Sequence, residues 1–300
     1  MSPRPDSGAR AETVLEVVVP AYNEEGRLPR GLALLCDKLA GMQIPASVVV
    51  VDNASTDGTS RIVREWPRGP VEVRLVSCER RGKGAAVRAG LMTTTAPFVG
   101  FCDVDMATDL SALDAVLPML AAGCPAVIGS RADRRSVVEV RHSRFRRVGA
   151  RVFRAMARVL VGPIGDTQCG FKFFAGPRVR EAAADLRETG FAFDVELLAR
   201  MRAKDLPVVE IPVRWRDVAG STFSVSRHSL GVFSQLFMIF ARVGLAGRGG
   251  RSLWRVRPAH PATAHPATAR PATGHPATAH SAALQASPQD GSAPVSSSAA

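Results

Sequence analysis

The chain has 300 residues, 46% hydrophobic and 22% charged, which is the composition of a folded protein and excludes a wholly disordered or fibrous one. Its formal net charge of +12 indicates anionic partners: phosphates, lipid headgroups or nucleic acid. The five cysteines are odd in number and lack metal-ligand spacing, so we expect free thiols in a reducing compartment.

Both ends of the chain are predicted to be disordered. Residues 1–13 contain no apolar stretch of the kind that a secretory signal requires. From Pro258 the sequence repeats the pattern HPATA and then becomes an Ala/Ser/Pro run without aromatic residues. Residues 258–300 hold one arginine and one aspartate, Arg270 and Asp290, so the net charge of +12 belongs to the rest of the chain.

Strand-like and helix-like runs alternate over the first third of the chain. β-Branched runs predict buried strands within residues 14–23, 47–60, 71–78 and 97–105, the second of which continues into a polar turn. The segments between them predict helices at 27–42, 60–66 and 82–94. This order predicts an α/β fold, a mostly parallel sheet with helices on both faces, whose ligands bind at the carboxyl ends of the strands.

Polar side chains gather at those carboxyl ends and at one helix start. In chain order they are Tyr22, Asn23 and Glu24; Asp52 and Asn53; Arg81 and Lys83; and Asp103 and Asp105. Each group by itself is weak evidence for a binding site, because Asx-rich turns usually have only a structural role. Lys83 opens a helix whose N-terminus suits an anion. In this order and spacing the four groups indicate a site for a nucleoside diphosphate and a divalent cation.

The pair Asp103 and Asp105 has to be compensated, since two close carboxylates at the end of a buried strand repel each other and lose hydration. Three arrangements supply compensation: a helix cap, a surface turn, or a divalent cation bound together with a phosphate. Asp109 or Ser111 can cap the following helix without help from the pair.

These motifs resemble those of family 2 glycosyltransferases of the GT-A fold. Within that family they resemble the polyprenyl-phosphate sugar synthases, most closely the dolichyl-phosphate β-glucosyltransferases. The resemblance covers about residues 14–247 and rests on the runs VVVPAYNEEGRLP, VVDNASTDGT, RGKGAAVRAGL, FCDVDMAT, IGSR, DTQCGFKFF, FAFDVELL and EIPVRW. The run DTQCGFKFF (166–174) is the most discriminating, because general members of the family lack it.

The resemblance implies an inverting transfer of a sugar, glucose from UDP-glucose in the first place, to a polyprenyl or dolichyl phosphate. It also implies dependence on Mg²⁺ or Mn²⁺ held by Asp103 and Asp105, which favours the cation over the helix cap. The residues that match nucleotide-binding or phosphate-binding positions are Pro20, Tyr22, Glu24, Asp52, Asn53, Asp103, Val104, Asp105 and Arg131. Of these, Asp105 and Arg131 are expected to act in catalysis.

Further candidates lie in the run 166–174, where Asp166, Gln168 and Lys172 are expected to face the donor or the acceptor while the phenylalanines pack. Cys169 is expected to be a small core residue, because no base lies near it in the sequence. Asp194, near the start of a predicted helix at 191–201, is carried over as a catalytic candidate near the acceptor. Its alternative role is a charge that favours the helix dipole.

The loop after the strand at residues 208–216 departs from the family pattern. Relatives carry a lysine soon after the Gly-Ser pair, where this sequence has Thr222. We therefore expect the diphosphate contact of this loop to pass to Arg216 or Arg227.

A lipid phosphate is ionised near neutral pH, so the reaction requires no strong general base. It does require screening of two anions, for which arginine is suited. A turn-rich, basic segment supplies Arg131, Arg141, Arg144, Arg146, Arg147, Arg151 and Arg154. The alternative is a basic helix face in solvent.

The predicted plan is a disordered N-terminus (1–13), a GT-A domain (14–226), a basic amphipathic helix region (227–257) and a disordered tail (258–300). The most apolar stretch, 230–247, is interrupted by Ser, Gln and Arg, so no transmembrane helix is expected. We expect a cytoplasmic protein that binds the anionic inner face of the membrane peripherally. A buried terminal helix fits the same stretch.

Three alternatives remain. The first is a family 2 enzyme that acts on a soluble or glycan acceptor. The second is a polyprenyl-phosphate mannosyltransferase that uses GDP-mannose. The third, a non-enzymatic nucleic-acid binder, is disfavoured because only 6% of the residues are aromatic and most of these lie in apolar runs.

Overall fold

The computed structural model describes residues 12–139, 144–216 and 234–244, and for residues 144–152 it describes the backbone alone. The expectations for the tail from Pro258, for Thr222 and Arg227, and for the side chains of the arginines at 141–151 lie outside the described residues. The domain boundaries therefore remain predictions.

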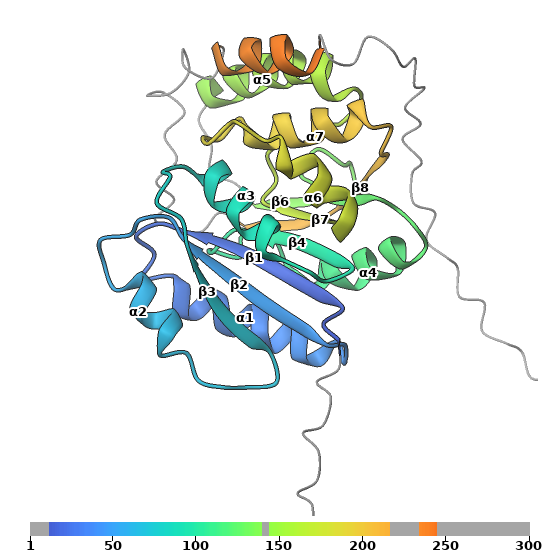
Figure 1. The fold of residues 1–300 in the computed structure, drawn as a ribbon. Helices are drawn as coiled ribbons and strands as arrows, with labels where there is room; N and C mark the ends of the chain where they lie inside the picture. The colour runs from blue at the N-terminus through green and yellow to red at the C-terminus, as the bar shows by residue number, and fades with distance from the viewer. Residues whose placement is uncertain (1–11, 140–143, 217–233, 245–300) are drawn as a thin grey trace, which may run out of the picture. The chain divides into compact units, whose positions relative to one another are not determined.

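Seven strands form one sheet in the order β3-β2-β1-β4-β7-β5-β8 (Figure 1). Their bounds are β1 (Leu15–Ala21), β2 (Ala46–Asp52), β3 (Glu72–Ser77), β4 (Phe98–Cys102), β5 (Ala126–Ser130), β7 (Phe171–Ala175) and β8 (Val208–Pro212). All neighbours pair parallel except β7, which runs antiparallel to β4 and β5. The mostly parallel sheet predicted from the alternation of elements is confirmed.

Helices cover both faces of this sheet, as predicted (Figure 1). One face carries α1 (Leu28–Gly41), α2 (Thr59–Arg64), the 3-10 turn η1 (Leu110–Ala112) and α4 (Leu113–Ala121). The other carries α3 (Lys83–Thr93), α6 (Gly176–Ala184), α7 (Phe193–Ala203) and, beyond α7, α5 (Arg144–Val161). A separate pair of short parallel strands, β6 (Val137–Glu139) and β9 (Arg214–Arg216), follows the ends of β5 and β8 in the chain.

The valine-rich strands are buried on both faces because neighbouring side chains alternate between them. Val17 and Val19 of β1 pack with α1 and α4 in one hydrophobic cluster. Val18 of the same strand packs with α3 and α7 in the other cluster. The same alternation in β7 sends Phe171 and Phe173 to the first cluster and Phe174 to the second.

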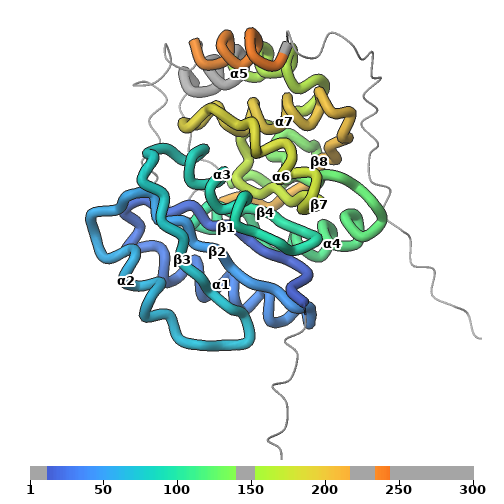
Figure 2. Tube along the Cα trace, viewed as in Figure 1, coloured from blue at the N-terminus to red at the C-terminus, as the bar shows by residue number. Residues whose placement is uncertain are grey.

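The segment after β6 differs from expectation, because the turn-rich basic stretch is in fact the 18-residue helix α5. Figure 2 shows α5 and the last described segment on the far side of α7 from the sheet. That last segment has helical turns at residues 234–239 that continue into the π-helix η2 (Phe240–Gly244). Its side chains Leu236, Ile239 and Val243 are buried, whereas Phe237 is 71% exposed.

None of the helices in the described ranges combines the length and the hydropathy that crossing a bilayer requires.

Candidate active site

The polar clusters predicted from the sequence meet at one edge of the sheet. β1, β2 and β4 are parallel, so their carboxyl ends lie together, and the loop after β2 is joined to β1 by a hydrogen bond from the Asn53 amide to the Ala21 carbonyl (2.8 Å). β7 is antiparallel, so its beginning rather than its end reaches this edge, and the Asp103 amide donates to the Gly170 carbonyl (3.1 Å). The DTQCG loop therefore contacts the Asp103–Asp105 segment directly.

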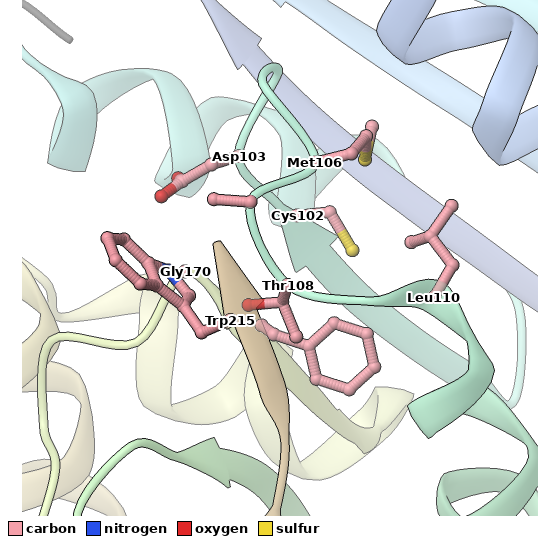
Figure 3. Close-up of a pocket in the computed structure, with 9 residues that line it drawn as sticks. Cys102, Asp103, Met106, Thr108, Leu110, Gly170 and Trp215 are labelled. Carbon is pink, nitrogen blue, oxygen red and sulfur yellow. The ribbon is translucent and has the colours of Figure 1, made fainter. Parts of the chain in front are cut away.

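Asp103 forms an ion pair with Lys83, whose Nζ lies 2.5 Å from Oδ1. Both side chains are partly exposed, Lys83 at 21% and Asp103 at 36%. On the opposite side the carboxylate rests against Gly170, where a Cβ atom would lie only 2.0 Å from Oδ2. Figure 3 shows Asp103 among the residues that line a pocket, together with Gly170, Thr108 and Trp215.

Asp105 is the less compensated carboxylate of the pair. Burial raises the pKa of Asp105, and the charge of Asp103 raises it further, against the weaker effects of the Ala107 amide and of nearby cations. Its Oδ1 accepts a hydrogen bond from that amide (3.1 Å). The loop is supported from below by Gly31 of α1, where a Cβ would lie 2.1 Å from the Val104 carbonyl oxygen.

The carboxylates of Asp103 and Asp105 supply only part of the ligands that a divalent cation needs. Two neighbouring carboxylates, one of them left with an uncompensated negative charge, are ligands that Mg²⁺ and Mn²⁺ accept. Within the described part of the chain, no group of three or more His, Cys, Asp or Glu side chains is arranged to hold a metal ion. The pair therefore fits a cation that completes its coordination with phosphate oxygens and water, as Mg²⁺ commonly does.

Lys172 does not face a ligand, and this expectation is wrong. Strand alternation turns it away from Phe171 and Phe173 toward α7, where it is fully buried. Its Nζ donates to Oδ1 of Asp194 (2.6 Å) and to the Cys169 carbonyl (2.5 Å). Burial raises the pKa of Asp194, and the charges of Lys172 and Lys83 act against that rise.

Asp194 is thus held by a lysine inside the protein, with 4% of its side chain exposed. A carboxylate in this position does not reach a substrate, so we treat Asp194 as a positioning residue rather than as a base. Lys83 interacts electrostatically with both Asp103 and Asp194. The structure therefore brings three of the predicted residues, Lys83, Lys172 and Asp194, into one chain of charges that ends at Asp103.

The N-terminus of α3 is occupied by the protein itself, which corrects the expectation of an anion site there. The amides of Gly84 and Ala85 donate to the Thr189 carbonyl at 2.7 and 3.4 Å. This contact needs glycine at Gly82, which has a φ of +119° and where a Cβ would lie 2.1 Å from the same carbonyl oxygen. Lys83 is therefore directed at a carboxylate instead of at a helix-bound phosphate.

Asp52 and Asn53 hold the backbone at the end of β2. Asp52 accepts hydrogen bonds from the Ser55 amide (3.1 Å) and from the Ser60 hydroxyl. The side chain of Asn53 donates to the carbonyls of residues 78 and 80 and accepts from the amide of residue 82. These bonds fix the loop that leads to Lys83; a role in nucleotide binding remains a prediction.

The loop after β1 is also tied to the loop after β2. Asn23 has a φ of +53°, and its Oδ1 accepts a hydrogen bond from the Thr56 amide (2.8 Å). Glu24 is paired with Arg27, and burial raises the pKa of Glu24 against the hydrogen bond and the charge of Arg27, which lower it. Tyr22 is 49% exposed, so its ring is open to a ligand, and Pro20 precedes it at the end of β1.

Arg131, directly after β5, is fixed by Asp166 of the DTQCG loop. Its Nε and Nη2 donate to the two carboxylate oxygens at 2.7 and 2.9 Å. Burial acts to raise the pKa of Asp166, but the hydrogen bonds and charge of Arg131 outweigh it and hold that pKa below its usual range. This fork leaves Nη1 as the nitrogen that can contact a further anion.

Two polar groups of the same loop are buried without a partner. The Thr167 hydroxyl and the Gln168 amide nitrogen have no hydrogen bond within residues 12–139, 144–216 and 234–244. Buried polar groups usually have partners, so these two mark where a water molecule or a ligand oxygen would fit. Cys169 is fully buried beside Thr108, as expected for a core residue, and burial raises the pKa of its thiol.

Trp215 in β9 is a site residue that the sequence motifs did not predict. Its ring lies 5.5 Å from the Arg131 guanidinium carbon and lines the pocket with Asp103 and Gly170 (Figure 3). The run EIPVRW contains this tryptophan, but the candidates in this strand and its loop were chosen by charge, as Arg216 and Arg227. Arg216 is highly exposed and pairs with Glu139 (2.9 Å), so its predicted contact with the diphosphate remains a prediction.

A family model described as glycosyl transferase family 2 matches residues 16–175, which run from β1 to the end of β7. A dolichyl-phosphate β-glucosyltransferase of Drosophila melanogaster is 36% identical over 243 residues, covering 76% of this chain and 74% of that protein. The human protein of the same name is 34% identical over 226 residues, covering 69% of this chain and 68% of that protein.

Solved structures of similar fold include glucosyl-3-phosphoglycerate synthase from Mycobacterium tuberculosis. One, in complex with Mn²⁺, UDP and glucosyl-3-phosphoglycerate, has a TM-score of 0.55 at 20% identity and covers 78% of this chain and 81% of that one. Another has a TM-score of 0.56 at 19% identity, with 78% and 82% covered. At this identity the likeness extends to the fold.

Proposed function

The chain belongs to glycosyl transferase family 2 and is a glycosyltransferase, and we propose that it transfers glucose from UDP-glucose to dolichyl phosphate or a similar polyprenyl phosphate. The relatives named dolichyl-phosphate β-glucosyltransferase support the acceptor and the sugar. Proteins of the same fold that were crystallised with UDP and Mn²⁺ support the nucleotide and a divalent cation, Mg²⁺ or Mn²⁺.

One observation carries this proposal: the DTQCG loop contacts both halves of the candidate site. At one end Gly170 supports the carboxylate of Asp103, and at the other Asp166 orients Arg131. A loop that fixes both a pair of cation ligands and an arginine suits an enzyme that holds two phosphates near each other. DTQCG also belongs to the run by which the sequence resembles the polyprenyl-phosphate sugar synthases rather than general members of the family.

On the donor side, Asp103 and Asp105 would hold the divalent cation, which would neutralise the diphosphate and stabilise it as a leaving group. The exposed ring of Tyr22 is placed to stack on the base, with Asn23, Glu24, Asp52 and Asn53 keeping the surrounding loops in shape.

On the acceptor side, the attacking group would be the phosphate oxygen of the lipid, which is ionised at neutral pH. No side chain has to remove a proton from it, in agreement with the buried, lysine-paired state of Asp194. Arg131 would position this phosphate through the part of its guanidinium that Asp166 leaves open. Trp215 would give the hexose an apolar wall beside Asp103.

An anionic membrane surface is the third proposed partner, at the inner face of a membrane. The segment 234–244 turns Phe237, Met238 and Phe240 outward. Arg154 and Arg158 of α5 are exposed as well, so the elements beyond α7 carry both exposed apolar and exposed basic side chains. Such a combination suits peripheral attachment to anionic lipid.

A donor and acceptor screen tests the proposal. Purified protein is incubated with UDP-glucose or GDP-mannose, with polyprenyl phosphate or the corresponding alcohol, and with Mg²⁺, Mn²⁺ or excess EDTA. We expect lipid-linked glucose from UDP-glucose and the lipid phosphate only, and none in EDTA. Product from GDP-mannose, or from a soluble phosphorylated acceptor in place of the lipid, would replace the proposed substrates by those.

A further inference from the structure

Lys83 forms an ion pair with Asp103, the carboxylate on which the proposed cation site depends. Its ammonium lies 2.5 Å from Oδ1 of Asp103, so one side of this carboxylate already carries a positive charge. The same carboxylate lies against the backbone of Gly170, so closely that a Cβ there would lie 2.0 Å from Oδ2 and 2.6 Å from Oδ1. Asp103 therefore contacts both a lysine and the backbone of the DTQCG loop, with 36% of its side chain left exposed.

Asp194 provides a second carboxylate near the ammonium of Lys83. Asp194 lies near the start of α3, because a Cβ on Gly84, the residue after Lys83, would lie 2.5 Å from the Cβ of Phe193, the residue before Asp194. The charge of Asp194 accordingly acts on Lys83. Asp194 is fixed by Lys172, which donates to its Oδ1 at 2.6 Å from a fully buried position. Lys83 is thus paired with one carboxylate at the candidate cation site and lies near a second one that is anchored inside the protein.

From this arrangement we propose that Lys83 is a built-in competitor of the divalent cation, which leaves Asp103 for Asp194 when the cation binds. The inference rests on the cation site proposed above. An ammonium and a divalent cation on one carboxylate repel each other, and the repulsion is strong in a partly buried site. Asp194 accepts the displaced charge, so the lysine stays neutralised inside the protein.

Competition of this kind is reciprocal: if Lys83 weakens cation binding, the cation weakens the pair of Lys83 with Asp103 by the same factor. Removing the ammonium should therefore strengthen cation binding, although a positive charge near a phosphate site would ordinarily be expected to help the enzyme. A lysine that only fixes the loop would leave the affinity for the cation unchanged. The two roles are separated by a measurement that needs neither donor nor acceptor.

The experiment titrates the full chain with Mn²⁺ alone and follows free Mn²⁺ by electron paramagnetic resonance. We expect Lys83→Met to bind Mn²⁺ about tenfold more tightly than the wild type, a difference of about 1.4 kcal/mol. The matched control is Lys38→Met, which removes a lysine paired with Asp114 at 2.6 Å on the opposite helical face of the sheet. This control should leave Mn²⁺ binding unchanged.

The role of Asp194 is tested by a double-mutant cycle. Asp194→Asn should weaken Mn²⁺ binding when Lys83 is present and have no such effect in the Lys83→Met background. Because this change leaves Lys172 buried without its carboxylate, circular dichroism first establishes that each variant folds. If Asp194→Asn does not fold, the comparison of Lys83→Met with the wild type still decides the competition.

The outcomes separate this inference from the cation site itself. Equal or weaker Mn²⁺ binding by Lys83→Met overturns the competition, and an equal effect of Asp194→Asn in both backgrounds overturns its role as acceptor of the charge. Loss of binding in Asp103→Asn and Asp105→Asn supports the cation site whatever Lys83 does. Absence of binding in every variant, Lys83→Met included, overturns both.

Discussion

Replacing Gly170 by alanine tests whether the DTQCG loop supports the carboxylate of Asp103 at the proposed cation site. A Cβ at this position would lie 2.0 Å from Oδ2, 2.2 Å from Cγ and 2.6 Å from Oδ1 of Asp103. All three atoms belong to one short side chain, so the Asp103 carboxylate has to rotate away from its present place. Rotation also breaks the 2.5 Å ion pair with Lys83.

The effect on stability should be small. An unfavourable rotamer of Asp103 costs about 0.5–1.5 kcal/mol, and the loss of a partly exposed ion pair adds about 0–1 kcal/mol. For a domain of this size the melting temperature should therefore fall by about 2–8 °C. The effect on activity should be larger, since disturbing a group that holds a cation ligand in place costs about 10- to 100-fold in activity.

Two measurements check this reasoning: the rate of transfer, and the rise in melting temperature that Mn²⁺ produces. Both should be lost together in Gly170→Ala. The matched control is Gly41→Ala at the end of α1, where a Cβ meets no atom within 4 Å and both quantities should keep their wild-type values. Wild-type transfer by Gly170→Ala, with an unchanged response to Mn²⁺, would refute the packing argument.

Three further predictions concern other parts of the molecule. Asp105→Asn should abolish transfer without lowering the melting temperature, because burial and the neighbouring carboxylate already disfavour the charge of Asp105. Full activity of this variant, or of the wild type in excess EDTA, would contradict the cation site. Arg131 lowers the pKa of Asp166, so the pair stabilises the fold at neutral pH by about 2 kcal/mol. This stabilisation is lost as the pH falls through the lowered pKa of Asp166. The difference in unfolding free energy between wild type and Asp166→Asn, measured by urea titration, should therefore become smaller in acid. A difference that stays the same at every pH would show that the ion pair of Asp166 with Arg131 does not cause it. Replacing Phe237 and Phe240 by serine should weaken co-sedimentation with vesicles of phosphatidylserine and phosphatidylcholine by about tenfold and leave transfer to a short-chain lipid phosphate in detergent unchanged; unchanged sedimentation would exclude this surface.

The sequence was sufficient for the strands β1 to β4 and for the edge at which the site lies, but it did not predict β5, β7 or the antiparallel direction of β7. β-Branched runs separated by helix-length segments predict parallel strands, and polar residues directly after three such strands must then meet. That reasoning placed Asp52 and Asp103 at the same edge, as the structure does. It could also foresee the cap by Asp109, whose carboxylate accepts from the Ser111 amide at 2.8 Å.

What the sequence could not show is which polar residue meets which. Lys172 lies between Phe171 and Phe173, so alternation places it on the other face of β7, but nothing local says that α7 covers this face with Asp194. The N-terminus of α3 carries the sequence of an anion site, and only the approach of Thr189 from more than a hundred residues later removes it. Trp215 was passed over because its neighbours are charged and the ring itself carries no such signal. In each case the missing information is a long-range contact.

The direction of β7 has a consequence for how new specificities arise in this architecture. β5 and β7 are antiparallel neighbours, with Ala126 opposite Phe174, so the chain between them leaves the sheet and returns beside its point of departure. Everything from Arg131 to Asp166 is therefore one contiguous excursion between two paired strands, with its two ends joined by the ion pair of these residues. This segment also pairs with β9 through β6 and packs against α7 through α5, whereas strands β1 and β2 and their loops lie outside it. Under the proposed function, exchanging this segment between relatives, together with its contacts, should change acceptor preference and leave donor preference unchanged.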